Sequence, residues 1–402
     1  MENKFYKEMK KELELLKKNG RYKKLRFLKS PLSGHAKLEE FDDVIIMCSN
    51  NYLGLANKPE IIEAGIKALK KYGTGAASVR FICGTFDIHR KLEERVADFL
   101  QTEACLTYMS CMDANMAVIP TLLDEGDGLV SDELNHASII DGCRLVKKGI
   151  EKRIYNHRDL SSLEKKLKEL KGCKNILVVT DGVFSMEGDI APLSGIIKLT
   201  KRYEALIMVD DSHGIGVLGK TGRGTIEYYD LMGKIDIITG TFGKALGGAG
   251  GGFVAAKKEI RDMLIQNSRF SLFSNSIPPV LAAIGIASID YLESDPELVV
   301  SLRKKIKHLR NKLKENNIKP LEGESAIIPI IVGETSIAIK IAQEMLQNEV
   351  YVTGFGFPVV PEGEARIRLQ VSDALSYEDI DKAVDKISKV FSVLSVKGKI
   401  PN

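Results

Sequence analysis

Between residues 105 and 239 the chain alternates short apolar segments with helical patterns, and this alternation constrains the fold more than any other feature. The apolar segments are 105–108, 128–130, 175–180, 205–209 and 236–239. Continuous apolar strands separated by helices are typical of a mainly parallel sheet covered on both faces. The sequence therefore predicts an α/β fold. Because ligands bind such sheets at the carboxyl ends of the strands, the residues that follow these segments are the candidate site.

The rest of the chain predicts further helices and a second, smaller α/β domain. In the first part, helices are expected at 59–72, 87–100, from Ser110, from His136, at 159–171 and at 192–203. After Pro278 the pattern changes to helices at 279–293, 296–316, 335–348 and from 376, with strands at 327–332, 351–353 and 366–370. A length of 402 residues exceeds one ordinary core. We expect an N-terminal helix and linker at 1–45, a large domain at 46–285 and a small domain at 286–402.

Composition and charge exclude several function classes. A net charge of +4 over the whole chain gives no reason to expect nucleic acid or an anionic membrane as a partner. No apolar run is long enough to span a bilayer, and the N-terminal residues lack the apolar core of a signal peptide. Phe5, Met9, Leu13 and Leu16 share one helical face, which predicts a helix that docks on the protein.

The six cysteines indicate neither a zinc site nor a disulfide framework, since none are two or three residues apart. We therefore expect no metal and a reducing cytoplasm.

One lysine, Lys244, lies in the glycine-rich segment 240–253 directly after an apolar strand. Glycine lets a backbone approach a ligand closely, because it lacks a Cβ. A partly shielded lysine can lose its proton and attack a carbonyl, most often that of pyridoxal phosphate. The plain alternative is a glycine-rich turn with an incidental lysine, and on this stretch alone the two interpretations are equally supported.

Polar residues also follow the other strands. Asp210 could pair with a protonated ring nitrogen or simply cap a turn, and Asp210 or Asp211 could hold a metal with His213. The helix from Ser110 offers free amides at Cys111 and Met112, which suit a phosphate, although an ordinary helix cap is commoner. His136 and Ser185 each follow a further strand. Capping explains each residue singly but explains the whole set poorly.

Residues 214–221 match the phosphate-loop pattern G-x-x-x-x-G-K-[ST], with Lys220 as its lysine. That motif needs a helix that begins at the lysine. Gly222 and Gly224 occupy the first turn of such a helix, where glycine is unfavourable. A nucleotide hydrolase using Lys220 is therefore retained only as a rival hypothesis.

Taken together, the motifs resemble the α-oxoamine synthases, which are pyridoxal-phosphate enzymes of the aspartate-aminotransferase fold type. The segments that carry the resemblance are CSNNYLGLAN (48–57), ASVRFICGT (77–85), SDELNHASIIDG (131–142), TDGVFSMEGDIAPL (180–193), MVDDSHGIGVLG (208–219), DIITGTFGKALGG (236–248), FSNS (273–276) and YVTGFGFPVVPEGEARIRLQ (351–370). They extend over nearly the whole chain. The resemblance implies fold type I, with a mainly parallel seven-stranded sheet in the large domain and a smaller C-terminal α/β domain.

The resemblance also assigns roles to individual residues. Lys244 would link covalently to pyridoxal phosphate and later move the α-proton of the bound amino acid. Asp210 would pair with the pyridine nitrogen, His213 and Ser185 would contact the phenolic oxygen, and His136 would stack on the ring. The remaining residues would bind other groups: Cys111, Met112 and Thr241 the phosphate, Ser274 and Asn275 the partner subunit's cofactor, and Asn50 and Arg368 the substrate carboxylate. An active homodimer follows from this assignment.

Within the family, the motifs RFICGT and VTGFGFPVVP favour the branch that reversibly condenses glycine with acetyl-CoA to 2-amino-3-oxobutyrate and acts in threonine breakdown. The alternative is the branch that joins alanine to a long pimeloyl-type acyl-CoA for biotin synthesis, or an enzyme with both activities. One residue and one segment depart from the family pattern. The residue is Met112, where an aromatic residue is common, and the segment is the glycine-rich 248–253. A non-catalytic relative is disfavoured, because it would not need Lys244, Asp210, His136 and Arg368 together.

Overall fold

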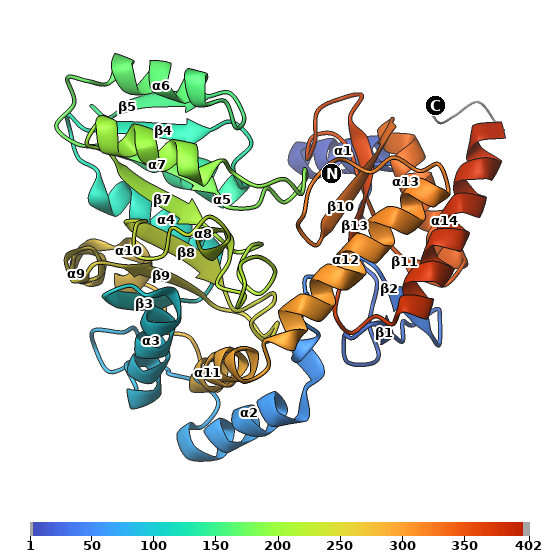
Figure 1. Cartoon of the computed structure of the whole chain (residues 1–402), viewed down its shortest axis with the longest axis horizontal. Helices are drawn as coiled ribbons and strands as arrows, with labels where there is room; N and C mark the ends of the chain where they lie inside the picture. Colours follow the sequence, from blue (N-terminus) through green and yellow to red (C-terminus); the bar gives the residue numbers. More distant parts are fainter. Residues whose placement is uncertain (1–2, 397–402) are drawn as a thin grey trace. The chain divides into compact units, whose positions relative to one another are not determined.

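The computed structural model describes residues 3–396, and their contacts divide the chain into two compact units (Figure 1). The larger unit consists of residues 50–185 and 189–303. The smaller unit consists of residues up to 49, the short segment 186–188 and the residues from 304. The division expected from the sequence, at 45 and 285, remains a prediction beside these units.

A seven-stranded sheet forms the centre of the larger unit. Its strands are β3 (Ala104–Tyr108), β4 (Gly128–Asp132), β5 (Glu151–Tyr155), β6 (Ile176–Asp181), β7 (Leu206–Asp210), β8 (Ile237–Thr241) and β9 (Gly252–Ala256). They lie in the order β3-β9-β8-β7-β6-β4-β5. The five strands from β8 to β5 are parallel, whereas β9 is antiparallel to both of its neighbours. The predicted fold, with its mainly parallel seven-stranded sheet, is confirmed.

Helices cover both faces of this sheet. Those of the larger unit are α2 (Pro59–Tyr72), α3 (Asp87–Leu100), α4 (Cys111–Leu122), α5 (Ala137–Arg144), α6 (Leu160–Glu169), α7 (Leu193–Arg202), α8 (Thr225–Tyr228), α9 (Lys258–Asn267), α10 (Arg269–Leu272) and α11 (Pro279–Ser294), with a short 3-10 turn at Leu55–Asn57. In Figure 1, α6 and α7 lie on one face of the sheet and α4 and α5 on the other. Strand residues on alternate sides, such as Leu177 and Val178, are both buried, as a doubly covered sheet requires.

Side chains at the ends of parallel strands start several helices and so fix where the strand-end loops lie. The Ser110 side chain accepts a hydrogen bond from the amide of Asp113 and caps α4. His136 caps α5 in the same way through its Nδ1 atom, which accepts from the amide of Ser138. Both caps lie directly after a strand or its loop, so these helices begin at the carboxyl edge of the sheet.

The smaller unit contains two small sheets. One has the order β1-β2-β11 and the other β10-β13-β12. Its elements are α1 (Lys4–Lys18), β1 (His35–Ala36), β2 (Val44–Ile46), β10 (Ile327–Gly333), α13 (Thr335–Gln347), β11 (Val350–Tyr351), β12 (Thr353–Phe355), β13 (Ala365–Gln370) and α14 (Tyr377–Val396). Helix α12 (Glu297–Glu315) begins in the larger unit and ends in the smaller one.

Among the features that differ from the sequence-based expectation are one strand and one helix. Strand β5 was not predicted, because its residues Glu151–Tyr155 are mostly polar and exposed at the edge of the sheet. Helix α1 forms as expected, yet none of its residues is buried among the described residues. The apolar face that predicted docking, with Phe5 63% and Met9 46% exposed, is therefore not covered by the described chain.

Candidate active site

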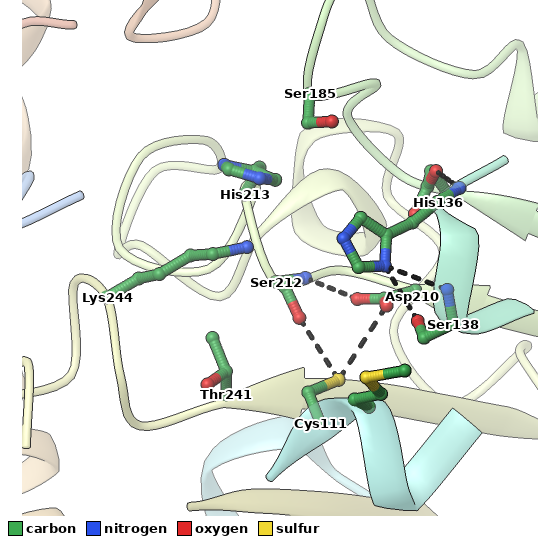
Figure 2. Close-up of a pocket in the computed structure, with 11 residues that line it drawn as sticks. Cys111, His136, Ser138, Ser185, Asp210, Ser212, His213, Thr241 and Lys244 are labelled. Atoms are coloured by element: carbon green, nitrogen blue, oxygen red, sulfur yellow. Dashed lines mark hydrogen bonds between the residues drawn. The ribbon is translucent and has the colours of Figure 1, made fainter. Parts of the chain in front are cut away.

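A pocket opens at the carboxyl edge of the larger unit's sheet (Figure 2). The space within it, open mouth included, is about 580 Å³. Its lining residues are Cys111, Met112, His136, Ser138, Asp181, Ser185, Asp210, Ser212, His213, Thr241 and Lys244. Eight of these are residues that the sequence assigned to a cofactor. The structure thus brings together side chains that end or follow five strands, β3, β4, β6, β7 and β8, at the shared edge that the sequence predicted.

Asp210 ends strand β7 and is the buried carboxylate of this pocket, with 5% of its surface exposed. Its Oδ1 atom accepts a hydrogen bond from the amide of Ser212, at 2.9 Å. Its Oδ2 atom accepts from Nδ2 of Asn115 at 2.6 Å and from the thiol of Cys111 at 3.7 Å. Burial raises the pKa of the Cys111 thiol well above its usual value, so this thiol keeps the proton that it donates. A carboxylate held by donors in this way is suited to a cationic partner.

The amino end of α4 faces the same pocket through Cys111 and Met112. Its approach to β9 depends on Gly252, where a Cβ would lie 2.3 Å from the amide nitrogen of Cys111. Thr241, at the end of β8, donates to the carbonyl of Gly251 and accepts from the amide of Gly243, each at 3.0 Å. A helix amino end with free amides and a nearby hydroxyl is suited to a phosphate group.

His136 and Asp181 line another wall. The amide of His136 donates to Oδ2 of Asp181 at 2.7 Å, and Nδ1 of His136 lies 2.7 Å from the Ser138 hydroxyl. Burial lowers the pKa of His136, which favours a neutral imidazole. Burial and the nearby Asp210 raise the pKa of Asp181 well above its ordinary value. In this pocket Asp181 therefore resists ionisation, whereas the nearby Asp210 accepts hydrogen bonds from several donors.

Lys244 extends into the pocket from the loop after β8, with its amine directed toward Ser212 and Asp210 (Figure 2). His213 lies above it in that view. The Tyr52 hydroxyl lies 2.7 Å from Nδ1 of His213 and donates to Oδ1 of Asn50 at 3.4 Å. This contact connects the predicted substrate residue Asn50 to a residue of the pocket.

Besides Asn50, three predicted residues are not part of the pocket lining. Ser274 and Asn275 follow α10, and the Asn275 side chain is exposed. Arg368 belongs to the smaller unit, where its guanidinium lies over the ring of Phe355 at 4.6 Å and donates to Oε1 of Gln370 at 3.1 Å. The roles assigned to these three residues remain predictions.

The sequence interpretation missed several residues of this region: Ser138, Asp181 and Ser212 in the pocket wall, Asn115 behind Asp210, and Tyr52 beside His213. Ser138 and Ser212 lie within two residues of predicted site residues, so proximity in the sequence could have found them. Tyr52 lies two residues from the predicted Asn50 and could have been found in the same way. Asn115 reaches the site only through the fold, and no local pattern marks it.

The donor set fits pyridoxal phosphate. Cys111, Met112 and Thr241 would hold its phosphate, Asp210 its protonated ring nitrogen, and Lys244 its aldehyde carbon. Gly252 lets the amino end of α4 approach the pocket, where its amides can bind an anion. The buried Asp210 supplies a fixed negative charge. The two features accept opposite charges in one cavity, as this cofactor requires.

The segment that resembles a phosphate loop has a different geometry. No helix begins at Lys220; the next helix is the four-residue α8, which starts at Thr225. The carboxylate of Glu227 accepts hydrogen bonds from the amide and hydroxyl of Thr221 and from the amide of Arg223, at 2.8–3.0 Å. An internal carboxylate thus occupies the place of a nucleotide phosphate, which argues against the nucleotide hydrolase.

Residues 3–396 contain no cluster of three or more His, Cys, Asp or Glu side chains arranged to hold a metal ion. Their helices include none with the length and apolarity needed to cross a bilayer.

Comparisons with known proteins identify the family of this chain. Residues 42–387 match the family model of class I and II aminotransferases. The 2-amino-3-ketobutyrate coenzyme A ligase of Salmonella typhimurium is 45% identical over 98% of this chain and 100% of its own length. An 8-amino-7-oxononanoate synthase of Thermoanaerobacter pseudethanolicus is 43% identical over 96% of this chain and 98% of its own length. The solved serine palmitoyltransferase of Sphingomonas wittichii superposes with a TM-score of 0.91 at 30% identity, and the match covers 99% of each chain.

These matches extend over nearly the whole chain, and other solved serine palmitoyltransferases with similar TM-scores carry pyridoxal phosphate. The family, the fold and the cofactor predicted from the sequence are therefore confirmed. The chain belongs to the class I and II aminotransferase family and, within it, to the pyridoxal-phosphate-dependent α-oxoamine synthases.

Proposed function

We propose that the chain is a glycine C-acetyltransferase, which condenses glycine with acetyl-CoA to 2-amino-3-oxobutyrate and CoA, and runs in reverse during threonine degradation. The observation that carries the proposal is the single pocket holding Lys244, Asp210 and His136 in a chain that is 45% identical to a 2-amino-3-ketobutyrate coenzyme A ligase over its full length. A bond forms between the α-carbon of glycine and the acetyl carbonyl carbon, the thioester C–S bond breaks, and CoA leaves as the thiol.

The cofactor, when bound, supplies an electron sink that stabilises the negative charge left when the α-carbon loses its proton. The protein's own groups do the rest. Asp210 would pair with the protonated ring nitrogen of the bound cofactor, which would make the cofactor a better acceptor of electrons. The Lys244 amine takes the proton from the α-carbon and returns it, since its side chain extends into the pocket. His136, held neutral by burial, lies against the same space and can donate a hydrogen bond from its ring.

The substrate carboxylate is assigned to Asn50 and Arg368, because a guanidinium meets a carboxylate with two parallel hydrogen bonds. We further propose a cytoplasmic homodimer in which Ser274 and Asn275 reach the partner subunit's cofactor. Two observations support this assembly: Asn275 is exposed, and the neighbouring Phe273 has 71% of its surface exposed. The six cysteines, all free in the structure, suit a reducing compartment.

The decisive experiment measures release of the CoA thiol with two substrate pairs at equal concentration. Glycine with acetyl-CoA should be turned over efficiently. L-Alanine with a long dicarboxylyl-CoA tests the second candidate function, 8-amino-7-oxononanoate synthase. A 43% identical relative of that name supports this candidate. Turnover of the second pair alone would overturn the proposal, whereas turnover of both would indicate a bifunctional enzyme.

A further inference from the structure

Helix α4 carries one polar side chain, Asn115, into the apolar core between the helix and the sheet. It is 0% exposed, as are its helix neighbours Ala114, Ala117 and Val118. A buried amide is costly unless its donors and acceptor are satisfied. The Nδ2 atom of Asn115 donates to Asp210 Oδ2 at 2.6 Å and to Ser138 Oγ at 2.8 Å, while Oδ1 accepts from the Thr239 hydroxyl at 2.7 Å. All three are short, and two of them lead toward the pocket.

The direction of these hydrogen bonds follows from Asp210. An ionised carboxylate only accepts, so the amide nitrogen of Asn115 must face it. The second N–H of that nitrogen then points to Ser138, whose oxygen is the acceptor. The hydrogen of the Ser138 hydroxyl is therefore free to go to Nδ1 of His136, 2.7 Å away, and the Ser138 amide also donates there at 3.2 Å. With two donors aimed at Nδ1, the proton of a neutral imidazole lies on Nε2.

The packing of two helices makes this arrangement possible. Gly142 on α5 faces α4, and a Cβ at that position would lie 3.0 Å from the backbone oxygen of Asn115. The absence of that carbon lets α5 approach α4. Ser138, one turn earlier on α5, is thereby brought within hydrogen-bond distance of the Asn115 side chain.

We propose that Asn115 and Ser138 are positioning residues that connect Asp210 to His136, so that one chain of hydrogen bonds holds Asp210 as an oriented carboxylate and His136 as its Nε2–H tautomer. This inference rests on the proposed function for the roles of Asp210 and His136. It adds that the same hydrogen bonds fix both the orientation of the Asp210 carboxylate and the tautomer of the His136 imidazole. Because this chain of hydrogen bonds, here called the bridge, engages Nδ1 of His136, the Nε2–H remains available as a donor to the pocket.

The experiment uses the full-length protein and measures two properties that need no substrate. The first is the dissociation constant of pyridoxal phosphate from the apoprotein. The second is the pKa of each histidine in the apoprotein, from hydrogen–deuterium exchange at the ring C2 position followed by mass spectrometry of peptides. The charged groups that face His136 are Asp210, Lys244 and Asp181, and all three are retained in every variant.

Two substitutions separate the two ends of the bridge. Asn115→Asp keeps the shape but places a second carboxyl group against Asp210; the two must share a proton, and the affinity for pyridoxal phosphate should fall about tenfold or more. Ser138→Ala removes a donor that favours the neutral imidazole, so the pKa of His136 should rise. Ser138→Thr retains the hydroxyl and should restore the wild-type value. His89, bonded instead to the Phe86 amide and the Ile277 carbonyl, is the internal control and should not move.

An unchanged His136 pKa in Ser138→Ala, or wild-type cofactor affinity in a folded Asn115→Asp protein, would overturn the inference. Far-UV circular dichroism establishes that each variant is folded, and if Asn115→Asp is not, the Ser138 pair decides alone. Failure of the proposed function is a separate result, because wild-type protein that releases no CoA from glycine and acetyl-CoA still reports the histidine pKa values.

Discussion

Two segments of this chain are candidates for binding a phosphate, and only one of them faces a pocket. Residues 214–221 match a phosphate-loop pattern letter by letter, whereas the start of α4 at Ser110 shows only a capping serine. In the structure the amide of Thr221, at the end of the first segment, and the amide of Arg223, just after it, donate to the carboxylate of Glu227. A Cβ at Gly219 would lie 2.2 Å from that carboxylate. The α4 end instead lines the pocket beside Thr241 and Lys244. A motif therefore indicates a binding site only if its donors have no partner within the protein.

The largest expected effect contrasts the lysines of the two segments. Lys244→Ala should lower CoA release by on the order of 10²- to 10⁴-fold, because it removes the amine that moves the α-proton. Lys220 is exposed and does not line the pocket, so Lys220→Ala should leave turnover unchanged. Steady-state thiol release with glycine and acetyl-CoA measures both. Equal losses in the two variants would refute the contrast.

The second prediction concerns stability in the first segment. Glu227→Ala should lower the free energy of unfolding by about 1–3 kcal/mol, because the amides of Thr221 and Arg223 lose their acceptor. The shift of the denaturant midpoint measures this loss. Glu259→Ala, an exposed change in α9, is the matched control and should have little effect. Wild-type stability in Glu227→Ala would mean that the carboxylate does not hold the loop.

The third prediction concerns the end of α4. Ser110→Ala removes the acceptor of the Asp113 amide and should cost about 0.5–2 kcal/mol of stability. It should also weaken the binding of pyridoxal phosphate, because the cap orients the amides of Cys111 and Met112. Asp159 caps α6, away from the pocket, by accepting from the amides of Ser161 and Ser162. Asp159→Ala should cost similar stability and leave cofactor affinity unchanged, and a loss of affinity there would contradict a local role for Ser110.

The same comparison explains what the sequence could predict. The boundaries of α2 and α3 agree with the predicted ranges 59–72 and 87–100, because helix ends are marked locally by proline, glycine and the apolar period. The strand-end residues were predictable as a set, because parallel strands bring their carboxyl ends to one edge. Strand β5 was not, since its side chains are polar and its pairing with β4 is a long-range choice.

Interactions between distant segments were the least predictable. Asn115 is an unfavourable residue in a helix, and nothing in its neighbours indicates that it contacts Asp210, 95 positions further along the chain. Likewise, Glu227 is an ordinary acidic residue until the loop folds back on it. Local patterns predicted the helices, the strands and the sheet edge at which the site lies. The hydrogen-bond partner of each polar group could be identified only from the folded structure.

The last prediction concerns a third polar cluster of the larger unit, in which, as in the Glu227 loop, the protein's own groups pair with one another. His157 lies 3.0 Å from a carboxylate oxygen of both Asp132, at the end of β4, and Asp189. Burial opposes its charge, but these two hydrogen bonds outweigh burial and raise the pKa of His157 from 6.5 to about 9. Because the folded pKa is the higher one, this stabilisation is complete below pH 6.5 and is lost as pH rises to about 9.

Unfolding free energies of wild type and His157→Gln, measured from pH 6 to 10, isolate this contribution. Their difference should be largest at the acidic end and should shrink as pH rises, whereas other titrating groups affect both proteins alike. If the difference were independent of pH, the imidazole would be held as a neutral hydrogen-bonding group rather than as a cation. A cluster that carries its own counter-charge, as this one does, leaves no charge for a ligand. The pocket differs because the groups that hold Asp210 in the structure are an amide nitrogen, a backbone amide and a thiol, none of which carries a positive charge.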